Sequence, residues 1–182
     1  MPDVPVIASA NLQALLDSYE NASIPNKIEQ LSKPVLVAET GEPAYMVLDN
    51  DGNRVLLGPE FILLNYGSTT ALTSSATLCQ VLLPFAPVIR ITAVEVAYRI
   101  DTTNTGTHFW SFDLQSEGTN QIITHASDEE AADVWNTYSN YSGMPDLDGP
   151  RSLDLIVAKH SSPGALDIIA QVRGRKVLAT TA

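Results

Sequence analysis

The sequence has few of the residues that build covalent scaffolds, charged surfaces or membrane spans. Its single cysteine, Cys79, excludes an intrachain disulfide and a four-cysteine zinc site, and its place in the apolar run LCQVLLPF predicts a small buried side chain. Only 17% of the 182 residues are charged, compared with about 25% in ordinary globular domains. The longest apolar run, VLLPFAPVI, is too short to cross a bilayer and contains two prolines. A disulfide-rich scaffold and a membrane-spanning helix are therefore not expected.

Basic residues are scarce in particular. The chain has 10 lysines and arginines against 21 aspartates and glutamates, which gives a formal net charge of −11. Phosphate backbones and anionic lipid surfaces are bound through Lys and Arg, so we expect neither nucleic acid nor a membrane as a partner. The first residues, MPDVPVIASAN, lack the basic start and the apolar stretch of a signal peptide, which predicts a protein that is made and kept soluble.

Motifs that carry chemistry are missing as well. His108, His125 and His160 form no H-x-H or H-E-x-x-H pattern, so no local pair presents two imidazoles to one metal ion. The sequence also lacks a G-x-S-x-G elbow, a phosphate loop and a dinucleotide fingerprint. We predict a non-enzymatic protein with no catalytic residues, no cofactor and no metal. The alternative left open is a β-sandwich enzyme whose site is assembled from distant strands.

Residues 1–66 are predicted to form a helical and β-hairpin extension. Leu12, Leu15, Leu16 and Tyr19 fall at i, i+3, i+4 and i+7, which places them on one face of a helix. Short helices are marginal alone, so this apolar face must be buried. It packs either on the chain's own domain or on copies of the chain or another protein. In the second case these four residues are candidate oligomer or anchor contacts.

Within this extension, the turn DNDGN lies between the apolar runs AYMVL and RVLLG and predicts a hairpin. A calcium loop is the competing interpretation, because Asp49, Asp51, Asn53 and Glu60 stand at positions 1, 3, 5 and 12 of that pattern. Arg54 occupies the position at which the loop needs glycine, and no helices flank the segment. The hairpin is therefore favoured.

Residues 67–80, GSTTALTSSATLCQ, are predicted to be a Ser/Thr-rich linker or an extended edge strand. Residues 81–182 carry a period-two pattern, which is clearest in HFWSFDLQ, where Trp110, Phe112 and Leu114 alternate with polar residues. The alternation recurs in VIRITAVEVAYRID, where its phase slips once, and in SLDLIVAK and ALDIIAQVR, and further strands are predicted at QIITHA and RKVLAT. Short strands separated by turn signals predict an antiparallel β-sandwich domain over 81–182.

The segment VWNTYSNYSG holds Trp135, Tyr138 and Tyr141 among polar residues. Aromatic side chains are mostly buried, so packing in the core or at a strand edge is the favoured interpretation. The alternative is an exposed platform on which sugar rings stack, for which these three residues are the candidate contacts.

The C-terminal lines ITAVEVAYRID, THFWSFDLQSEG and LDLIVAKHSSPGALDIIAQVRGRKVL resemble jelly-roll-like β-sandwich domains of tailed-bacteriophage structural proteins. The resemblance covers roughly residues 81–178 and brings no catalytic residues. It implies a virion component assembled in the host cytoplasm, either a capsid decoration (cement) protein or a short head or tail fibre, usually a homotrimer. Its implied partners are copies of itself and other virion proteins, such as the major capsid protein or a tail or neck protein.

The sequence thus predicts a mainly β chain, with an antiparallel, jelly-roll-like β-sandwich and a short N-terminal helical and β-hairpin extension. The expected function is structural, through homo-oligomeric assembly in a phage particle. The alternative function is a carbohydrate- or receptor-binding module, such as a fibre tip, that contacts host-surface glycans through exposed aromatic residues.

Overall fold

The computed structural model describes most of the chain. The described residues are 6–15, 35–37, 40–48, 54–83, 88–103, 105–118, 120–127, 131–141, 144–148 and 151–180. Strands fill most of these stretches, as the sequence predicts. Helical structure within them is confined to a 3₁₀ turn, Ser9–Asn11, which continues as a short helix over residues 12–15. No helix among the described residues has the length and hydropathy needed to cross a bilayer.

The chain divides into two compact units, and each takes residues from several parts of the sequence. Unit 1 comprises Met1–Phe61, Pro87–Arg90 and Arg175–Ala182, and unit 2 comprises Ile62–Ala86 and Ile91–Gly174. Three strands contribute residues to both units: β4 (Arg54–Leu72), β6 (Ile89–Ile100) and β12 (Leu166–Thr180).

Unit 1 contains short strands that lead into a hairpin. β1 (Val6–Ile7) pairs parallel with β2 (Val35–Val37), which pairs antiparallel with β3 (Pro43–Leu48). Gly41 lies in the turn between β2 and β3 at a φ of +68°, a conformation that glycine adopts without a steric penalty. β3 then pairs antiparallel with β4, which confirms the predicted hairpin strands. The turn between them, including three of the four residues of the calcium pattern, lies outside the described residues.

The core of unit 1 is one small apolar cluster. Its buried members come from the helical turn and from three strands: Leu12, Val35, Val37, Ala44, Met46 and Leu56. Ile7, Leu15, Leu178 and Ala179 pack against it while partly exposed. The helical turn is therefore buried against the chain's own strands at Leu12.

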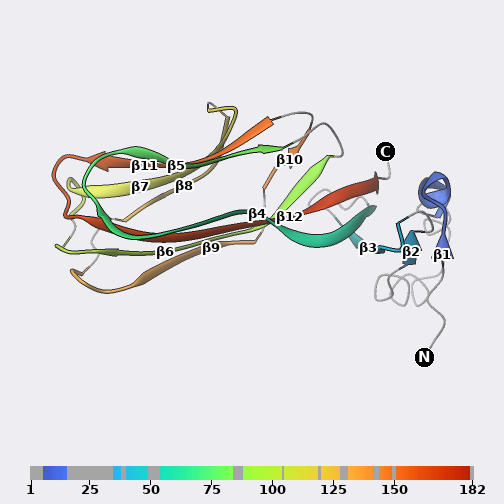
Figure 1. The fold of residues 1–182 in the computed structure, drawn as a ribbon, viewed down its shortest axis with the longest axis horizontal. Coiled ribbons are helices and arrows are strands. Elements are labelled where there is room, and N and C mark those ends of the chain that lie inside the picture. The colour runs from blue at the N-terminus through green and yellow to red at the C-terminus, as the bar shows by residue number, and fades with distance from the viewer. Residues whose placement is uncertain are drawn as a thin grey trace. The chain divides into compact units, whose positions relative to one another are not determined.

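Unit 2 is a sandwich of two antiparallel sheets (Figure 1). Its remaining strands are β5 (Ala76–Leu83), β7 (Phe109–Ser116), β8 (Asn120–Ala126), β9 (Asn136–Asn140), β10 (Asp146–Leu147) and β11 (Arg151–His160). One sheet has the order β4-β12-β6-β9, with the two-residue β10 also pairing with β6. The other has the order β5-β11-β7-β8.

This order is that of a jelly roll. With β10 set aside, the described strands of unit 2 follow along the chain as β4, β5, β6, β7, β8, β9, β11 and β12. The first, eighth, third and sixth of them form one sheet, and the second, seventh, fourth and fifth form the other. Such an interleaved double-sheet arrangement is the jelly roll found in viral capsid and lectin domains. The predicted architecture is thereby confirmed for unit 2.

Alternating side chains fill the space between the two sheets. On β7, Trp110, Phe112 and Leu114 are all buried, with half-buried residues between them. The rings of Tyr98, on β6, and Phe112 lie 4.7 Å apart between their centroids, which joins the two layers. Ala93 and Val94 are neighbours in sequence and both buried, so the alternation of β6 changes phase where the sequence predicts it.

The structure places the start of the sandwich differently from the expected arrangement of a 1–66 extension, a linker or edge strand over 67–80, and an 81–182 sandwich. Residues 67–72 belong to β4, and residues 76–80 belong to β5, an edge strand of the second sheet. The sandwich therefore includes residues from 62 onward. Ser and Thr suit half-buried strands as well as linkers, which is why composition does not place this boundary.

Strands β12 and β5 also differ from the sequence prediction in two smaller ways. The separate strands predicted at ALDIIAQVR and RKVLAT form one continuous strand, β12. Cys79 is half-buried on β5 rather than buried. Edge strands have a neighbour on one side only, so their side chains are covered less completely.

Candidate binding surface on the outer face of the sandwich

The outer face of the β4-β12-β6-β9 sheet carries a group of polar side chains. β9 pairs with β6 so that Glu95 lies opposite Ser139 and Ala97 lies opposite Thr137. Side chains opposite each other in a ladder project to the same side of the sheet. Val96, between Glu95 and Ala97, is buried, so the four residues face away from the sandwich interior.

The three candidate platform residues do not lie together. Trp135 and Tyr141 are exposed, by 44% and 60%, and are six residues apart, which places them on the same outer face. Tyr138 is half-buried and lies opposite Val96, with its ring stacked on His125 at 4.3 Å between centroids. Residues three apart along a strand project to opposite faces, so the alternative of one platform made of all three residues does not form, and Tyr138 packs as the favoured interpretation expects.

Tyr138 belongs to an aromatic cluster between the sheets. The His125 ring also stacks on Phe112, at 6.0 Å between centroids, and its Nε2 lies 3.2 Å from the Tyr98 hydroxyl, within hydrogen-bond distance. The void beside these rings has a volume of about 10 Å³, roughly the space of one water molecule. The inner position of Tyr138 is therefore a packing position.

A groove with a volume of about 410 Å³ lies on the outer face. Residues of all four strands line this open groove: Asn65 on β4, Ile169 and Gln171 on β12, Glu95, Val96 and Ala97 on β6, and Thr137, Tyr138 and Ser139 on β9. With strands about 4.8 Å apart, a groove that crosses four of them extends over roughly 14 Å. Ile169 is 46% exposed, so the groove has an apolar contact surface among hydroxyl and amide groups.

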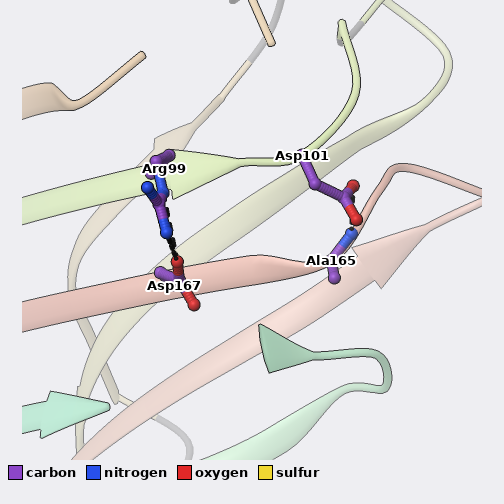
Figure 2. A network of polar contacts seen from close by, with 4 residues as sticks. All are labelled: Arg99, Asp101, Ala165 and Asp167. Carbon is purple, nitrogen blue, oxygen red and sulfur yellow. Dashed lines mark hydrogen bonds and ion pairs between the residues drawn. The ribbon is translucent and has the colours of Figure 1, made fainter. Parts of the chain in front are cut away.

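The charged groups of this face are paired with one another. Arg99 Nη2 and Nε donate to Asp167 Oδ2 at 2.5 and 3.1 Å (Figure 2). The hydrogen bond to Asp167, reinforced by the charges of Asp167 and Asp133, raises the pKa of the Arg99 guanidinium, which stays protonated. Arg173 Nη2 forms a second ion pair with Glu95 Oε1 at 3.2 Å. Both acidic side chains of these pairs are therefore matched by a cation on the same face.

Polar contacts also hold the two exposed aromatic rings. The Arg99 guanidinium lies over the Trp135 ring, 5.5 Å from its centroid. The Tyr141 hydroxyl donates to Glu95 Oε1 at 2.7 Å. Trp135 lies just before β9 and Tyr141 just after it, on either side of Thr137 and Ser139, which line the groove. The rings therefore flank the β9 end of the groove and are held in place before any ligand binds.

A tight turn connects β11 to β12 and packs against the end of β6. Asp101 Oδ1 accepts a hydrogen bond from the Ala165 backbone N–H at 2.8 Å (Figure 2), and the Asp101 N–H donates to the Ala165 carbonyl at 3.1 Å. Trp110 Nε1 donates to the Gly164 carbonyl at 2.9 Å. A Cβ on Gly164 would collide with the side chains of Asp101 and Thr102 and lie 2.9 Å from the Thr102 backbone nitrogen. Glycine is therefore required at position 164, because the turn lies too close to Asp101 and Thr102 to leave room for a Cβ atom.

The other two histidines lie near the β7 and β11 ends. His160 Nε2 is 3.0 Å from Ser111 Oγ, and its ring stacks on Phe109 at 4.3 Å. His108 Nδ1 accepts a hydrogen bond from the Ser162 N–H at 3.2 Å. Across the described ranges, no group of three or more His, Cys, Asp or Glu side chains is placed to hold a metal ion.

The candidate anchor residues divide between two outcomes. Leu12 is buried in the core of unit 1 and Leu15 packs against that core, which fits the interpretation that the helical face covers the chain's own strands. Leu16 and Tyr19 lie outside the described residues.

Sequence reasoning missed most of the groove. It identified Trp135 and Tyr141, but not Glu95, Ile169 or Gln171, which are the outward-facing neighbours of predicted core residues. The alternation does predict that these residues face outward, because every second side chain of a strand points away from the face that holds the core residues. Which outward-facing residues come together depends on the strand order, which the sequence alone did not provide.

No protein-family model matches the chain, and no curated protein matches it. Several solved structures are similar at low identity. A structure of infectious bursal disease virus, Gx strain, matches with a TM-score of 0.39 and 9% identity, over 74% of this chain and 38% of that one. A carbohydrate-binding module from Cellvibrio mixtus lichenase 5A, in complex with cellotriose, matches with a TM-score of 0.32 and 14% identity, over 81% of this chain and 92% of that one.

A further carbohydrate-binding module of that class, from a laminarinase of Zobellia galactanivorans, matches with a TM-score of 0.31 and 14% identity, over 73% of this chain and 88% of that one. The strand order and packing of this chain's own residues define the jelly roll.

Proposed function

We propose that the chain is a non-enzymatic structural component of a tailed-bacteriophage particle, which decorates or cements the capsid or forms a short fibre through homo-oligomeric assembly. The role requires no catalytic residue, cofactor or metal. The proposed partners are copies of the chain, as a homotrimer, and other virion proteins such as the major capsid protein or a tail or neck protein.

The observation that carries the assembly role is the edge strand β5. It lies at the end of the β5-β11-β7-β8 sheet, and its sequence, ATLCQVLL, contains no charged residue. Leu82 on this strand is 77% exposed. Proteins that remain monomeric protect their edge strands with charges, prolines or a covering segment. An uncharged edge with an exposed leucine is better explained if another protein surface covers it.

The test of the assembly role is the mass of the intact chain in solution. Sedimentation velocity at micromolar concentration should give an oligomer, with an interface well above the ~1,000 Å² expected of a specific contact. Leu82→Lys should shift the chain toward monomer, whereas Val134→Lys, at another exposed apolar residue, should not. A monomeric wild-type chain would count decisively against the role. Antibody labelling of intact particles, viewed by electron microscopy, then tests the virion location.

The second candidate function is a carbohydrate- or receptor-binding module, for example at a fibre tip. The observation that favours it is that Trp135 and Tyr141 are exposed on one face beside the groove. Binding to glycans or adsorption to host cells should weaken in Trp135→Ala. Unchanged binding in this variant would remove the candidate.

A further inference from the structure

We infer that the outer groove of unit 2 binds an uncharged saccharide chain, with sugar rings stacked on Trp135 and Tyr141 and hydroxyl groups bound by the side chains between them. This inference rests on the second candidate function and specifies the chemical class of the ligand. The ligand is extended rather than a single ring, because Trp135 and Tyr141 lie beyond opposite ends of β9, about 20 Å apart by strand geometry.

The charges of the groove favour a neutral ligand. Glu95 is paired with Arg173 and Asp167 with Arg99, and the negative charge of Asp133 also acts on Arg99, so the face presents no excess positive charge for an acidic ligand. An acidic ligand would have to compete with a carboxylate for each of these guanidinium groups. A neutral ligand leaves both pairs intact.

The hydrogen-bonding groups of the groove match sugar hydroxyls. Asn65 and Gln171 carry amides, each with donors and an acceptor, and Thr137 and Ser139 carry hydroxyls that can do both. Sugar hydroxyls also donate and accept, so each can be matched without a buried charge. Ile169 adds an apolar surface for the C–H face of a ring.

Each of the two aromatic rings is held by one polar contact on the outer face. The Arg99 guanidinium covers Trp135, and the Tyr141 hydroxyl is bound to Glu95. A ring held in place loses little conformational freedom on binding, which improves affinity. The same contacts link each aromatic ring to one of the ion pairs, so the charged pairs act as supports for the rings.

The experiment uses the intact chain and a glycan array that contains neutral gluco-, galacto- and manno-oligosaccharides together with uronic-acid, sialylated and sulfated glycans. The neutral oligosaccharides should be retained in preference to the acidic ones. Calorimetric titration with the best neutral oligosaccharide should give an affinity that does not change when salt is raised, because no charge is neutralised.

Variants then locate the site. Trp135→Ala should weaken binding at least about tenfold, as expected of a central aromatic contact, and Gln171→Ala should weaken it less. Ala97→Trp fills the groove while removing no hydrogen-bonding side chain, and should abolish binding. Tyr45→Ala, at an exposed tyrosine of unit 1, is the matched control and should bind as the wild type does. Circular dichroism and thermal unfolding confirm that each variant is folded.

Three outcomes would overturn the inference in distinguishable ways. Preferential retention of acidic glycans would refute the neutral ligand but keep a glycan-binding function. Retention of no glycan at millimolar concentration would refute the glycan-binding function as well. If Trp135→Ala and Ala97→Trp dissociate the oligomer and leave glycan binding unchanged, the groove is an interface between copies and the glycan binds elsewhere on the chain.

Discussion

Units 1 and 2 obtain their cores in different ways. Unit 2 closes two sheets over each other, so that period-two strands bury one face each and large side chains such as Trp110 and Tyr98 are almost fully enclosed. Unit 1 has short strands, and its cluster consists of aliphatic residues from those strands and one helical turn. The same chain therefore combines two kinds of core. Simple alternation along the strands specifies the core of unit 2, whereas the core of unit 1 depends on a few individual contacts.

The largest expected effect comes from breaking the core of unit 2. Trp110→Ala removes a fully buried ring and its hydrogen bond to the Gly164 carbonyl, and should lower the free energy of unfolding by about 3–5 kcal/mol. Urea unfolding followed by circular dichroism measures the loss. Trp135→Ala, at a 44% exposed ring, is the matched control and should cost about 1 kcal/mol or less. Equal losses in the two variants would contradict the described core.

The next effect tests unit 1. Leu12→Ala removes a side chain that is 3% exposed from a small cluster, and should cost about 2–3 kcal/mol, at the lower end of the range for leucine in a core. Both tryptophans belong to unit 2, so their fluorescence reports on that unit alone. We expect the midpoint seen by circular dichroism to fall more than the fluorescence midpoint. A larger fall in fluorescence would show that Leu12 supports unit 2 instead.

The turn between β11 and β12 provides a sharper test of how closely unit 2 is packed. Gly164→Ala places a methyl group against Asp101 and Thr102 and should displace the hydrogen bond from the Ala165 N–H to Asp101, at a cost of about 1–3 kcal/mol. Gly106→Ala is the control, because a Cβ there meets nothing within 4 Å. Thermal unfolding of both variants decides. An unaffected Gly164→Ala would mean that this turn is looser than described.

The smallest effect concerns the polar contact inside the aromatic cluster. Tyr98→Phe removes the hydroxyl that lies 3.2 Å from His125 Nε2 and keeps the ring, so we expect a loss of about 0.5–1.5 kcal/mol. Tyr45→Phe, at an exposed tyrosine, should be close to neutral. Denaturant midpoints compare the two. A gain in stability in Tyr98→Phe would mean that the hydroxyl is better solvated in the unfolded chain than it is bonded in the core.

The sequence predicted unit 2 better than unit 1, for a physical reason. In β7, every second residue is apolar, so Trp110, Phe112 and Leu114 could be assigned to the core without knowing their neighbours. β4 was predicted as a strand of the extension, and the prediction for residues 67–80 kept both a linker and an edge strand, because the Ser/Thr-rich residues between Gly67 and Gln80 have no clear alternation. In unit 1, Leu12 could be placed on an apolar face, but not on a particular partner.

The candidate site was predicted less completely than the fold. Trp135 and Tyr141 were identified because exposed aromatic residues stand out among polar ones. Tyr138 was grouped with Trp135 and Tyr141 because the three residues are close in sequence. Successive side chains along a strand point to opposite faces, however, so Tyr138 points away from the face of the other two. Gln171 and Asn65 carry no signal of their own, because amides on outward-facing strand positions are common. Only the placement of β4 and β12 in one sheet brings them together.

The interleaving of the two units along the chain determines how the molecule can be divided. The chain passes between them at 61/62, 86/87, 90/91 and 174/175, so no single contiguous fragment holds one complete unit and nothing else. A fragment of residues 81–182 lacks all of β4 and most of β5, one strand from each layer of the sandwich. Such a fragment would leave one edge of β12 and most of one edge of β11 unpaired, and it would aggregate through these uncovered edges. Circular permutation would not separate the units either, because residues 87–90 of unit 1 would still interrupt the 62–174 segment that holds unit 2.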